Sequence, residues 1–268
     1  MPNIKIGCAG WAYDDWIGPF YPSYISKDRF LTHYSKYFDI VETNSTHYSV
    51  PKEPILKKWA ASVPEDFKFC VKIWNGITHI KDYGLGIQNL YSFFNTLNPI
   101  NDMIAYYLFQ FPPSFKKTDN HIDYIKEILK KIDTEKKIVI ELRDNSWFDS
   151  SLLKELINGI NHILGTVYLN DIIPLYPDWQ KSYYIRVIGD RTLTKFDKVQ
   201  REMSEIWAHL SNFLKKNENN THIEDIFVIF NNHYSGFSPA DSNRLKKILG
   251  LPIRDFNKKS NITDFFKI

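Results

Sequence analysis

Short apolar or β-branched runs alternate along the chain with longer segments whose apolar positions recur every three or four residues. The runs have the length of buried strands, and the longer segments have the spacing of helices that bury one face. Eight strands are predicted, at 4–7, 39–42, 68–72, 104–109, 138–141, 166–169, 183–186 and 226–230. Seven helices are predicted between them, at 27–37, 52–61, 87–97, 121–131, 150–159, 200–216 and 240–249. This alternation is typical of repeated βα units and a parallel sheet.

The sixth connection departs from the alternation. Residues 172–181 contain Pro174 and Pro177, which favour a loop over a helix. No Gly/Ser-rich linker or shift in composition divides the chain, so one domain is predicted over 1–268. Eight βα units in one domain of this length favour a (β/α)8 TIM-type barrel, an α/β fold, with an irregular sixth crossover. A doubly wound sheet is less favoured because it usually has fewer strands and a Gly-rich first turn, and no GxGxxG motif occurs.

Composition narrows the class of protein. The chain has 268 residues, of which 43% are hydrophobic and 24% charged, and it lacks an apolar run near membrane-span length. A soluble protein without membrane contact is therefore expected. The net charge of +3 does not by itself favour nucleic acid, and two cysteines, Cys8 and Cys70, make no disulfide framework. No basic segment followed by an apolar stretch opens the chain, so we expect a cytoplasmic location.

Candidate site residues follow from the barrel prediction, because active sites of such barrels lie at the carboxyl ends of the strands. Glu42 and Glu141 end two strands, where paired carboxylates facing one cavity could act as acid and base. A cationic concavity suited to phosphate or carboxylate oxygens is predicted from Lys72, His79, Arg143 and Arg186. Further ligand contacts are predicted for Trp11, Tyr13, Asn44, Tyr48 and Asn231.

Each prediction has a structural alternative. The two glutamates could form a network with Arg or Lys, and the cations could merely neutralise the nearby carboxylates. Trp16 and Trp147 are expected to pin loops rather than touch a ligand. A divalent metal could be held by His79, Glu42, Glu141, Asp171 and His233. No tight ligand spacing such as HxH or HExxH occurs, so a metal is not favoured and no cofactor is predicted.

Several longer motifs carry a resemblance to a known family. They are Gly10-Trp11-Ala12-Tyr13, Val41-Glu42-Thr43-Asn44-Ser45-Thr46-His47-Tyr48, Phe109-Gln110-Phe111-Pro112-Pro113-Ser114-Phe115, Glu141-Leu142-Arg143, Tyr184-Ile185-Arg186 and Phe230-Asn231-Asn232. Together they resemble the YecE-like proteins, catalogued as a domain of unknown function, number seventy-two. The resemblance spans nearly the whole chain and implies a TIM-type barrel without an established activity.

Two positions depart from the pattern of that family. The family usually has His where this chain has Ile188, so the resemblance brings no imidazole to that position. It prefers Phe where this chain has His47, and His47 is therefore left out of the candidate site.

We predict a cytoplasmic hydrolase or lyase that acts on a small anionic substrate, such as a sugar phosphate, a nucleotide or a nucleic-acid end. Glu42 and Glu141 would do the acid/base work, while the cations hold the anion and stabilise developing charge. Two alternatives stay open: a glycosidase-like enzyme on a neutral sugar, and a non-catalytic module that binds nucleic acid or a partner. The sequence makes no prediction of the oligomeric state.

Overall fold

The computed structural model describes residues 1–132 and 134–256, so residues 257–268 of the predicted domain lie outside the described residues. In the described part, nine parallel strands form one sheet, in the order β6-β5-β4-β3-β2-β1-β9-β8-β7. The strands are β1 (Asn3–Ala9), β2 (Ile40–Thr43), β3 (Lys68–Lys72), β4 (Ile104–Gln110), β5 (Lys137–Glu141), β6 (His162–Leu164), β7 (Thr166–Tyr168), β8 (Ser182–Val187) and β9 (Asp225–Phe230).

The sheet curls into a nearly closed barrel whose two ends meet at Gly165. β6 pairs with β5, β7 pairs with β8, and Gly165 joins β6 to β7 in the chain. The Gly165 N–H still donates to the carbonyl oxygen of Ile140, at 2.9 Å, so the residue bridges the two short strands. The predicted sixth strand at 166–169 is therefore one half of a divided strand, and the TIM-type barrel is confirmed.

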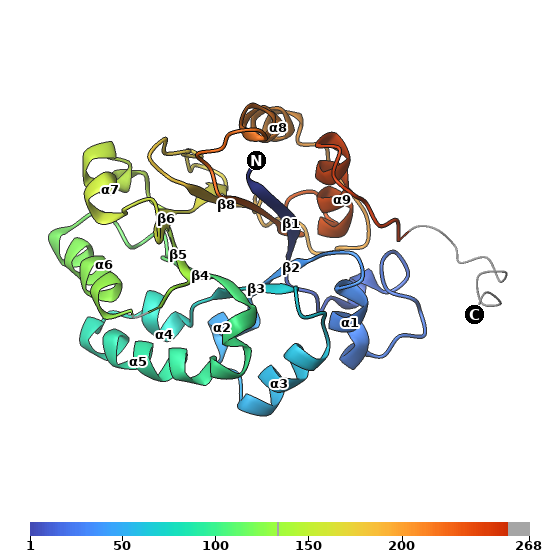
Figure 1. The fold of residues 1–268 in the computed structure, drawn as a ribbon, viewed down its shortest axis with the longest axis horizontal. Coiled ribbons are helices and arrows are strands. Elements are labelled where there is room, and N and C mark those ends of the chain that lie inside the picture. The colour runs from blue at the N-terminus through green and yellow to red at the C-terminus, as the bar shows by residue number, and fades with distance from the viewer. Residues whose placement is uncertain (133, 257–268) are drawn as a thin grey trace.

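Helices surround the strands on the outside of the barrel (Figure 1). The α-helices with five or more residues are α1 (Phe30–Tyr34), α3 (Glu53–Ala61), α5 (Tyr83–Thr96), α6 (Asp119–Lys131), α7 (Ser150–Leu156), α8 (Ser204–Asn217) and α9 (Ser238–Ile248). The four-residue α-helices are α2 (Ser45–Tyr48) and α4 (Asn75–Thr78), and the 3-10 turns are η1 (Asp14–Trp16), η2 (Lys27–Arg29), η3 (Asn98–Met103) and η4 (Asn145–Trp147). All seven predicted helices occur, with shifted ends, whereas α2 and α4 were not predicted.

Local sequence explains where several helices begin. The side chains of Asp82, Thr118 and Asp149 accept hydrogen bonds from backbone N–H groups in the first turns of α5, α6 and α7. These caps satisfy donors that have no partner inside the helix. Each helix then buries one apolar face against the sheet, as Ile125 and Ile128 do in α6.

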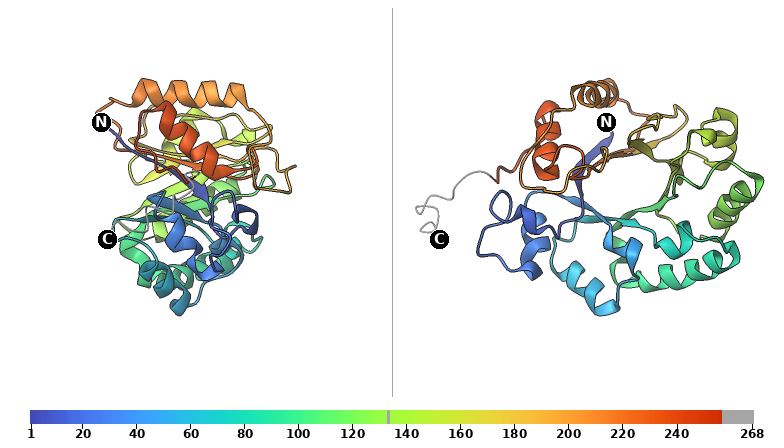
Figure 2. Two further views of the ribbon diagram at one scale, coloured as in Figure 1. Left: turned by 90° about the vertical axis from the view of Figure 1, so that its right-hand side faces the viewer. Right: turned by 180° about the vertical axis from the view of Figure 1, so that it is seen from behind.

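The crossover between β7 and β8 has no helix in residues 169–181, all of which the structure describes. The prediction of an irregular sixth crossover is therefore confirmed. A loop spans the space between α7 and α8, and Figure 2 shows the same arrangement from the side and from behind.

The core fills the barrel and the layer between strands and helices. Cys8 and Cys70 lie in it as free, fully buried thiols. Trp16 and Trp147 are also fully buried, and their indole N–H groups donate to Asn232 Oδ1 and to the Phe115 carbonyl oxygen. Both rings hold loops in place, as predicted. Among the described residues, the helices are all too short or too polar to cross a membrane.

Candidate functional site

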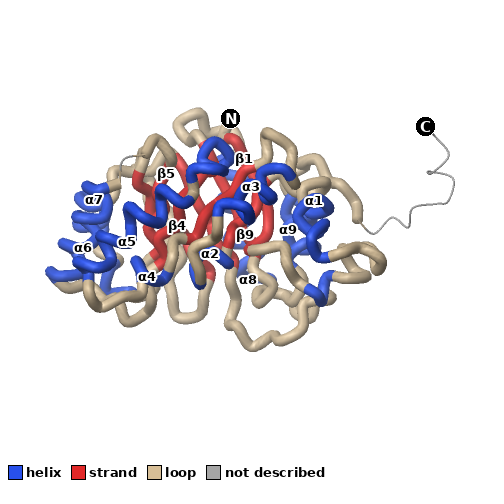
Figure 3. The backbone as a smooth tube through the Cα atoms, turned by 90° about the horizontal axis from the view of Figure 1, so that it is seen from below, coloured by secondary structure: helices blue, strands red, loops and turns tan. Residues whose placement is uncertain are grey.

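The carboxyl ends of the strands open into a cavity of about 280 Å³. Loops gather at this edge of the barrel, opposite the N-terminus (Figure 3). The cavity is lined by Tyr13, Asn44, Tyr48, Lys72, Arg143, Arg186, Ile188, Arg191, Phe196, Asn231, Asn232 and His233. We call it the central cavity, and it lies where barrel enzymes carry their active sites.

A network of ion pairs forms the floor of the central cavity. Arg186 donates from Nε and Nη2 to the two carboxylate oxygens of Glu42, each at 2.7 Å, and from Nη1 to Glu141 Oε2 at 2.6 Å. Arg143 Nε donates to the other oxygen of Glu141, at 2.7 Å, and the Tyr184 hydroxyl donates to Glu42 at 3.0 Å. Both glutamates are fully buried. All four of their carboxylate oxygens therefore face a guanidinium group.

The electrostatics of this floor keep Glu141 ionised. Burial alone would raise the pKa of its carboxyl group, but the charges and hydrogen bonds of Arg186 and Arg143 outweigh burial and lower the pKa to about 2. A general acid needs a proton near neutral pH, and a general base needs a free lone pair. The acid/base roles of Glu42 and Glu141 stay predictions, and the geometry favours the alternative of a charge network.

Positive charge exceeds negative charge around the central cavity. Lys72, Arg143, Arg186 and Arg191 line it, and Glu42 and Glu141 compensate two of these cations. The remaining surplus is two positive charges when Lys72 is protonated. The nearby carboxylate of Asp190 does not reduce the surplus, because Arg201 binds both of its oxygens, at 2.6 and 2.7 Å.

Lys72, the last residue of β3, differs from the three arginines. The residue is only 7% exposed, yet Nζ makes no hydrogen bond or ion pair with any described residue. Burial, helped by the charges of Arg186 and Arg143, lowers the pKa of its amine to about 7, although Glu42 and Glu141 act in the opposite direction. A large fraction of Lys72 is therefore uncharged at neutral pH.

A loop that follows β8 closes one side of the central cavity. Its backbone turns at Gly189 and at Arg191, whose φ angles of 80° and 62° lie in the left-handed region. The bidentate pair of Asp190 and Arg201 ties the two ends of this loop together. Between them, the loop carries Arg191 and Phe196 to the cavity wall. Glycine adopts this conformation freely, but at Arg191 it is strained, and strained residues of this kind are often found at functional sites.

The structure brings most of the predicted ligand contacts together. Seven of them line the central cavity, namely Tyr13, Asn44, Tyr48, Lys72, Arg143, Arg186 and Asn231. Trp11 does not: its ring packs on Trp59, at a centroid distance of 5.1 Å, and lines a separate hollow beside α3. His79 is also outside the lining, with Nδ1 at 2.9 Å from the Thr78 hydroxyl and its ring against His47.

The sequence-based prediction did not include two residues of the cavity wall, Arg191 and Phe196, because it considered only residues close to the predicted strand ends. Gly189 followed by a charged residue was an available signal, since glycine in a long loop after a barrel strand often marks a turn over the site. Ile188, where the resembling family usually has His, also lines the cavity. The wall at this point is therefore apolar in this chain.

Two buried polar atoms in the cavity wall have no partner among the described residues. They are the amide nitrogen Nδ2 of Asn232 and the ring nitrogen Nδ1 of His233. The amide oxygen of Asn232 is by contrast fully used, since it accepts from Trp16 and Ser238. That contact fixes the orientation of the amide and leaves a donor available to a ligand oxygen or a water.

The residues considered for a divalent metal do not form a ligand cluster. Within residues 1–132 and 134–256, no group of three or more His, Cys, Asp and Glu side chains is arranged to hold a metal ion. The two glutamates that would contribute to such a site bind arginines instead.

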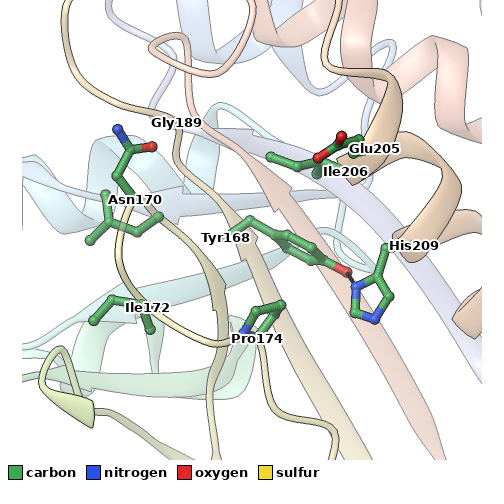
Figure 4. Close-up of a pocket in the computed structure, with 9 residues that line it drawn as sticks. Tyr168, Asn170, Ile172, Pro174, Gly189, Glu205, Ile206 and His209 are labelled. Atoms are coloured by element: carbon green, nitrogen blue, oxygen red, sulfur yellow. Dashed lines mark hydrogen bonds between the residues drawn. The ribbon is translucent and has the colours of Figure 1, made fainter.

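A second cavity, of about 260 Å³, lies outside the barrel between α8 and the loop after β7. It occupies the region that lacks a sixth helix. Figure 4 shows Asn170, Ile172 and Pro174 on one side and residues of α8 on the other, with the Tyr168 hydroxyl hydrogen-bonded to His209 Nδ1, at 2.8 Å. Its lining is mainly apolar and contains no Lys or Arg. Of these two cavities, only the central cavity is therefore lined by Lys or Arg side chains.

Comparison with known proteins agrees with this architecture. A family model described as "Protein of unknown function DUF72" matches residues 5–263. UPF0759 protein YunF of Bacillus subtilis (strain 168) is 23% identical over 280 residues, which cover 92% of this chain and 95% of that protein.

Solved structures are similar over nearly the whole length. A DUF72 family protein from Thermotoga maritima MSB8 has a TM-score of 0.75 at 22% identity, covering 92% of this chain and 99% of that one. A DUF72 family protein from Enterococcus faecalis V583 has a TM-score of 0.74 at 22% identity, covering 96% and 99%. These likenesses show a shared fold.

Proposed function

Because the chain belongs to the DUF72 family, which is described as being of unknown function, we propose its function from the central cavity. It is a cytoplasmic enzyme, a hydrolase or lyase, that binds a small phosphorylated substrate at the carboxyl end of the barrel. The observation that carries the proposal is the surplus of positive charge in a partly buried cavity, which is one charge when Lys72 is neutral and two when it is protonated.

A phosphate monoester matches this surplus. Such a group carries a charge of about −1.5 to −2 at pH 7 and has three acceptor oxygens. Arg143 uses only Nε for Glu141, and its two terminal nitrogens make no hydrogen bond with a described residue. Arg191 likewise has no ion-pair partner in the described part of the chain. Both guanidinium groups can therefore bind phosphate oxygens in the bidentate manner that arginine favours.

The rest of the cavity suits a small molecule. About 280 Å³ lies near the lower end of the volumes of small-molecule sites, which begin at roughly 300 Å³. Tyr13, Tyr48 and Phe196 supply aromatic surface, and the free amide donor of Asn232 can bind a substrate hydroxyl or carbonyl. We assign Glu42 and Glu141 to positioning Arg186 and Arg143 rather than to proton transfer.

The two alternatives are less well supported. A glycosidase needs two carboxyl groups about 5–10 Å apart with the sugar between them, whereas Arg186 bridges Glu42 and Glu141 here. Binding of nucleic acid through the same cations would be strongly weakened by salt, because each neutralised phosphate releases counterions. A single phosphate in a partly buried cavity responds to salt far less steeply.

Replacing Arg143 or Arg191 with alanine is expected to weaken binding of phosphorylated ligands by about tenfold to a hundredfold. This is the effect of losing one charge-assisted hydrogen-bonding group, worth about 1.5–3 kcal/mol. Thermal shift and titration calorimetry with inorganic phosphate, glucose 6-phosphate and AMP would measure it. Glucose and a short oligonucleotide serve as the neutral and polymeric probes.

Arg29→Ala is the matched control, because Arg29 is exposed on η2 and its removal changes the net charge equally. The proposal predicts wild-type affinity for this variant. Stabilisation by glucose alone would support the glycosidase alternative. Equal loss of affinity in all three variants would mean that the cavity does not bind the phosphate.

A further inference from the structure

We propose that Lys72 is a nucleophile, and that its amine forms an imine with the carbonyl carbon of a phosphorylated aldehyde or ketone. This inference rests on the proposed function, since Arg143 and Arg191 must hold the phosphate group. It narrows the substrate from phosphorylated compounds in general to phosphorylated carbonyl compounds, and the reaction to lyase chemistry.

The backbone at Lys72 is held firmly. The Lys72 carbonyl oxygen accepts a hydrogen bond from the Thr46 hydroxyl at 2.6 Å, and the carbonyl oxygen of the next residue, Ile73, is 2.9 Å from His47 Nδ1. Both contacts come from α2, the short helix that follows β2. The side chain therefore starts from a fixed point at the rim of the barrel and extends into the cavity.

The amine of Lys72 has no ion-pair partner because arginines bind the carboxylates around it. Buried lysines are rare and are almost always paired with a carboxylate. Here Glu42 and Glu141 lie near enough to raise the pKa of Lys72, but their oxygens receive hydrogen bonds from Arg186 and Arg143. Among the described residues nothing binds Nζ, so a structural role as an ion-pair partner does not explain this lysine.

The same surroundings make the amine nucleophilic. Enzymes activate lysine in two ways, by removing it from water and by placing cations beside it. Both operate here, since burial and then the charge of Arg186 lower the pKa of Lys72 to about 7. A lysine in water has a pKa near 10.4 and is almost wholly protonated at pH 7. Lys72 instead has a lone pair available in a large fraction of molecules.

The chemical step balances without any further reagent. The nitrogen lone pair forms a C–N bond while the carbonyl π pair moves to oxygen, and one proton passes from nitrogen to that oxygen. The resulting hydroxyl group then leaves with the second nitrogen proton as water, and a C=N bond remains. Once the imine nitrogen takes up a proton, the C=N group withdraws electrons from the carbon attached to it. A lyase uses this effect to break a bond from that carbon to the next atom.

Reductive trapping tests the inference. The purified full-length chain is mixed with dihydroxyacetone phosphate at pH 7, borohydride is added, and the labelled lysines are identified by peptide mass mapping. We expect at least tenfold more label on Lys72 than on any surface lysine. The yield should reach half of its maximum near pH 7, in line with the pKa of Lys72.

Matched variants separate site labelling from adventitious labelling. Lys72→Met and Lys72→Arg should both lose the label, and the arginine variant retains a charge in case the methionine variant folds poorly. Lys68→Met removes a lysine from the other end of the same strand, whose Nζ donates to the Asp102 carbonyl oxygen, and should label as the wild type does. Unphosphorylated dihydroxyacetone should give at least tenfold less label.

The outcomes distinguish this inference from the proposed function. Binding of dihydroxyacetone phosphate in the thermal-shift assay without label on Lys72 would overturn the imine and leave the proposed function intact. Failure of every phosphorylated ligand to bind would overturn both. Label spread evenly over surface lysines, in the wild type and in Lys72→Arg alike, would also refute the nucleophile.

Discussion

Replacing Arg186 with methionine is expected to lower the free energy of unfolding by about 3–5 kcal/mol at pH 7, which is the usual cost of removing one partner of a buried ion pair. The change removes three hydrogen bonds and leaves Glu42 with no cationic partner in the described structure. Glu141 retains only Arg143. Urea denaturation followed by circular dichroism would measure the loss.

The pH dependence of Arg186→Met provides a second, independent readout. In the wild type the pKa of Glu141 is lowered from 4.5 to about 2, so its contribution to stability is complete above pH 4.5 and is lost as the pH falls toward 2. Without Arg186, burial is the largest remaining influence and raises that pKa. The difference in stability between wild type and variant should therefore shrink as the pH falls through this range.

Two controls make the prediction about Arg186 specific. Arg29→Met removes an exposed arginine and should change stability by less than about 0.5 kcal/mol. Arg186→Met combined with Glu42→Gln should be more stable than Arg186→Met alone, because the unpaired buried charge has gone. If the double variant is no more stable than Arg186→Met, the network does not act by charge compensation.

Gly189→Ala is expected to destabilise the protein and to weaken phosphate binding by about tenfold or more. Gly189 has a φ of +80°, and a Cβ there would clash with the carbonyl oxygen of His233 and lie 2.7 Å from the Cα of Tyr234. The left-handed conformation costs about 1–3 kcal/mol for a residue other than glycine. The backbone clash adds to this, because neither atom belongs to a flexible side chain.

Gly18→Ala is the matched control for the clash. Gly18 has a φ of +100°, but a Cβ there would meet nothing within 4 Å. Its variant should show the conformational cost alone and keep the affinity for phosphate. Titration calorimetry and urea denaturation on both variants would separate the two effects. Equal affinities in the two variants would mean that the turn at Gly189 is not needed to place Arg191 at the cavity wall.

The repeated pattern of strands and helices was readable from the sequence because each element buries one face over several residues. The short strand β6 was not, because His162, Ile163 and Leu164 are too few residues for a periodic signal. The helices α2 and α4 have only four residues each, which is too short for a periodic signal. Residue type thus predicts long elements well and short interruptions poorly.

The candidate site was likewise predictable from the sequence only in part. The barrel rule located Lys72, Arg143 and Arg186 at one cavity, since the ends of parallel strands must meet there. It could not decide whether a glutamate at a strand end faces a ligand or a guanidinium group. That choice depends on the length and direction of Arg186, which reaches Glu42 from β8 and spans to Glu141 on β5. Such three-way contacts have no signature in the order of residues.

The two buried cysteines provide a reporter for these experiments. Burial raises the pKa of the Cys8 thiol to about 11 and also raises that of Cys70, so neither sulfur is a thiolate or accessible to reagents in the native state. A chromogenic disulfide reagent should therefore react only with molecules that have opened. Because the chain contains no other cysteine, the labelling rate measures how often the native structure opens. It therefore allows the stabilities of Arg186→Met and Gly189→Ala to be compared without denaturant.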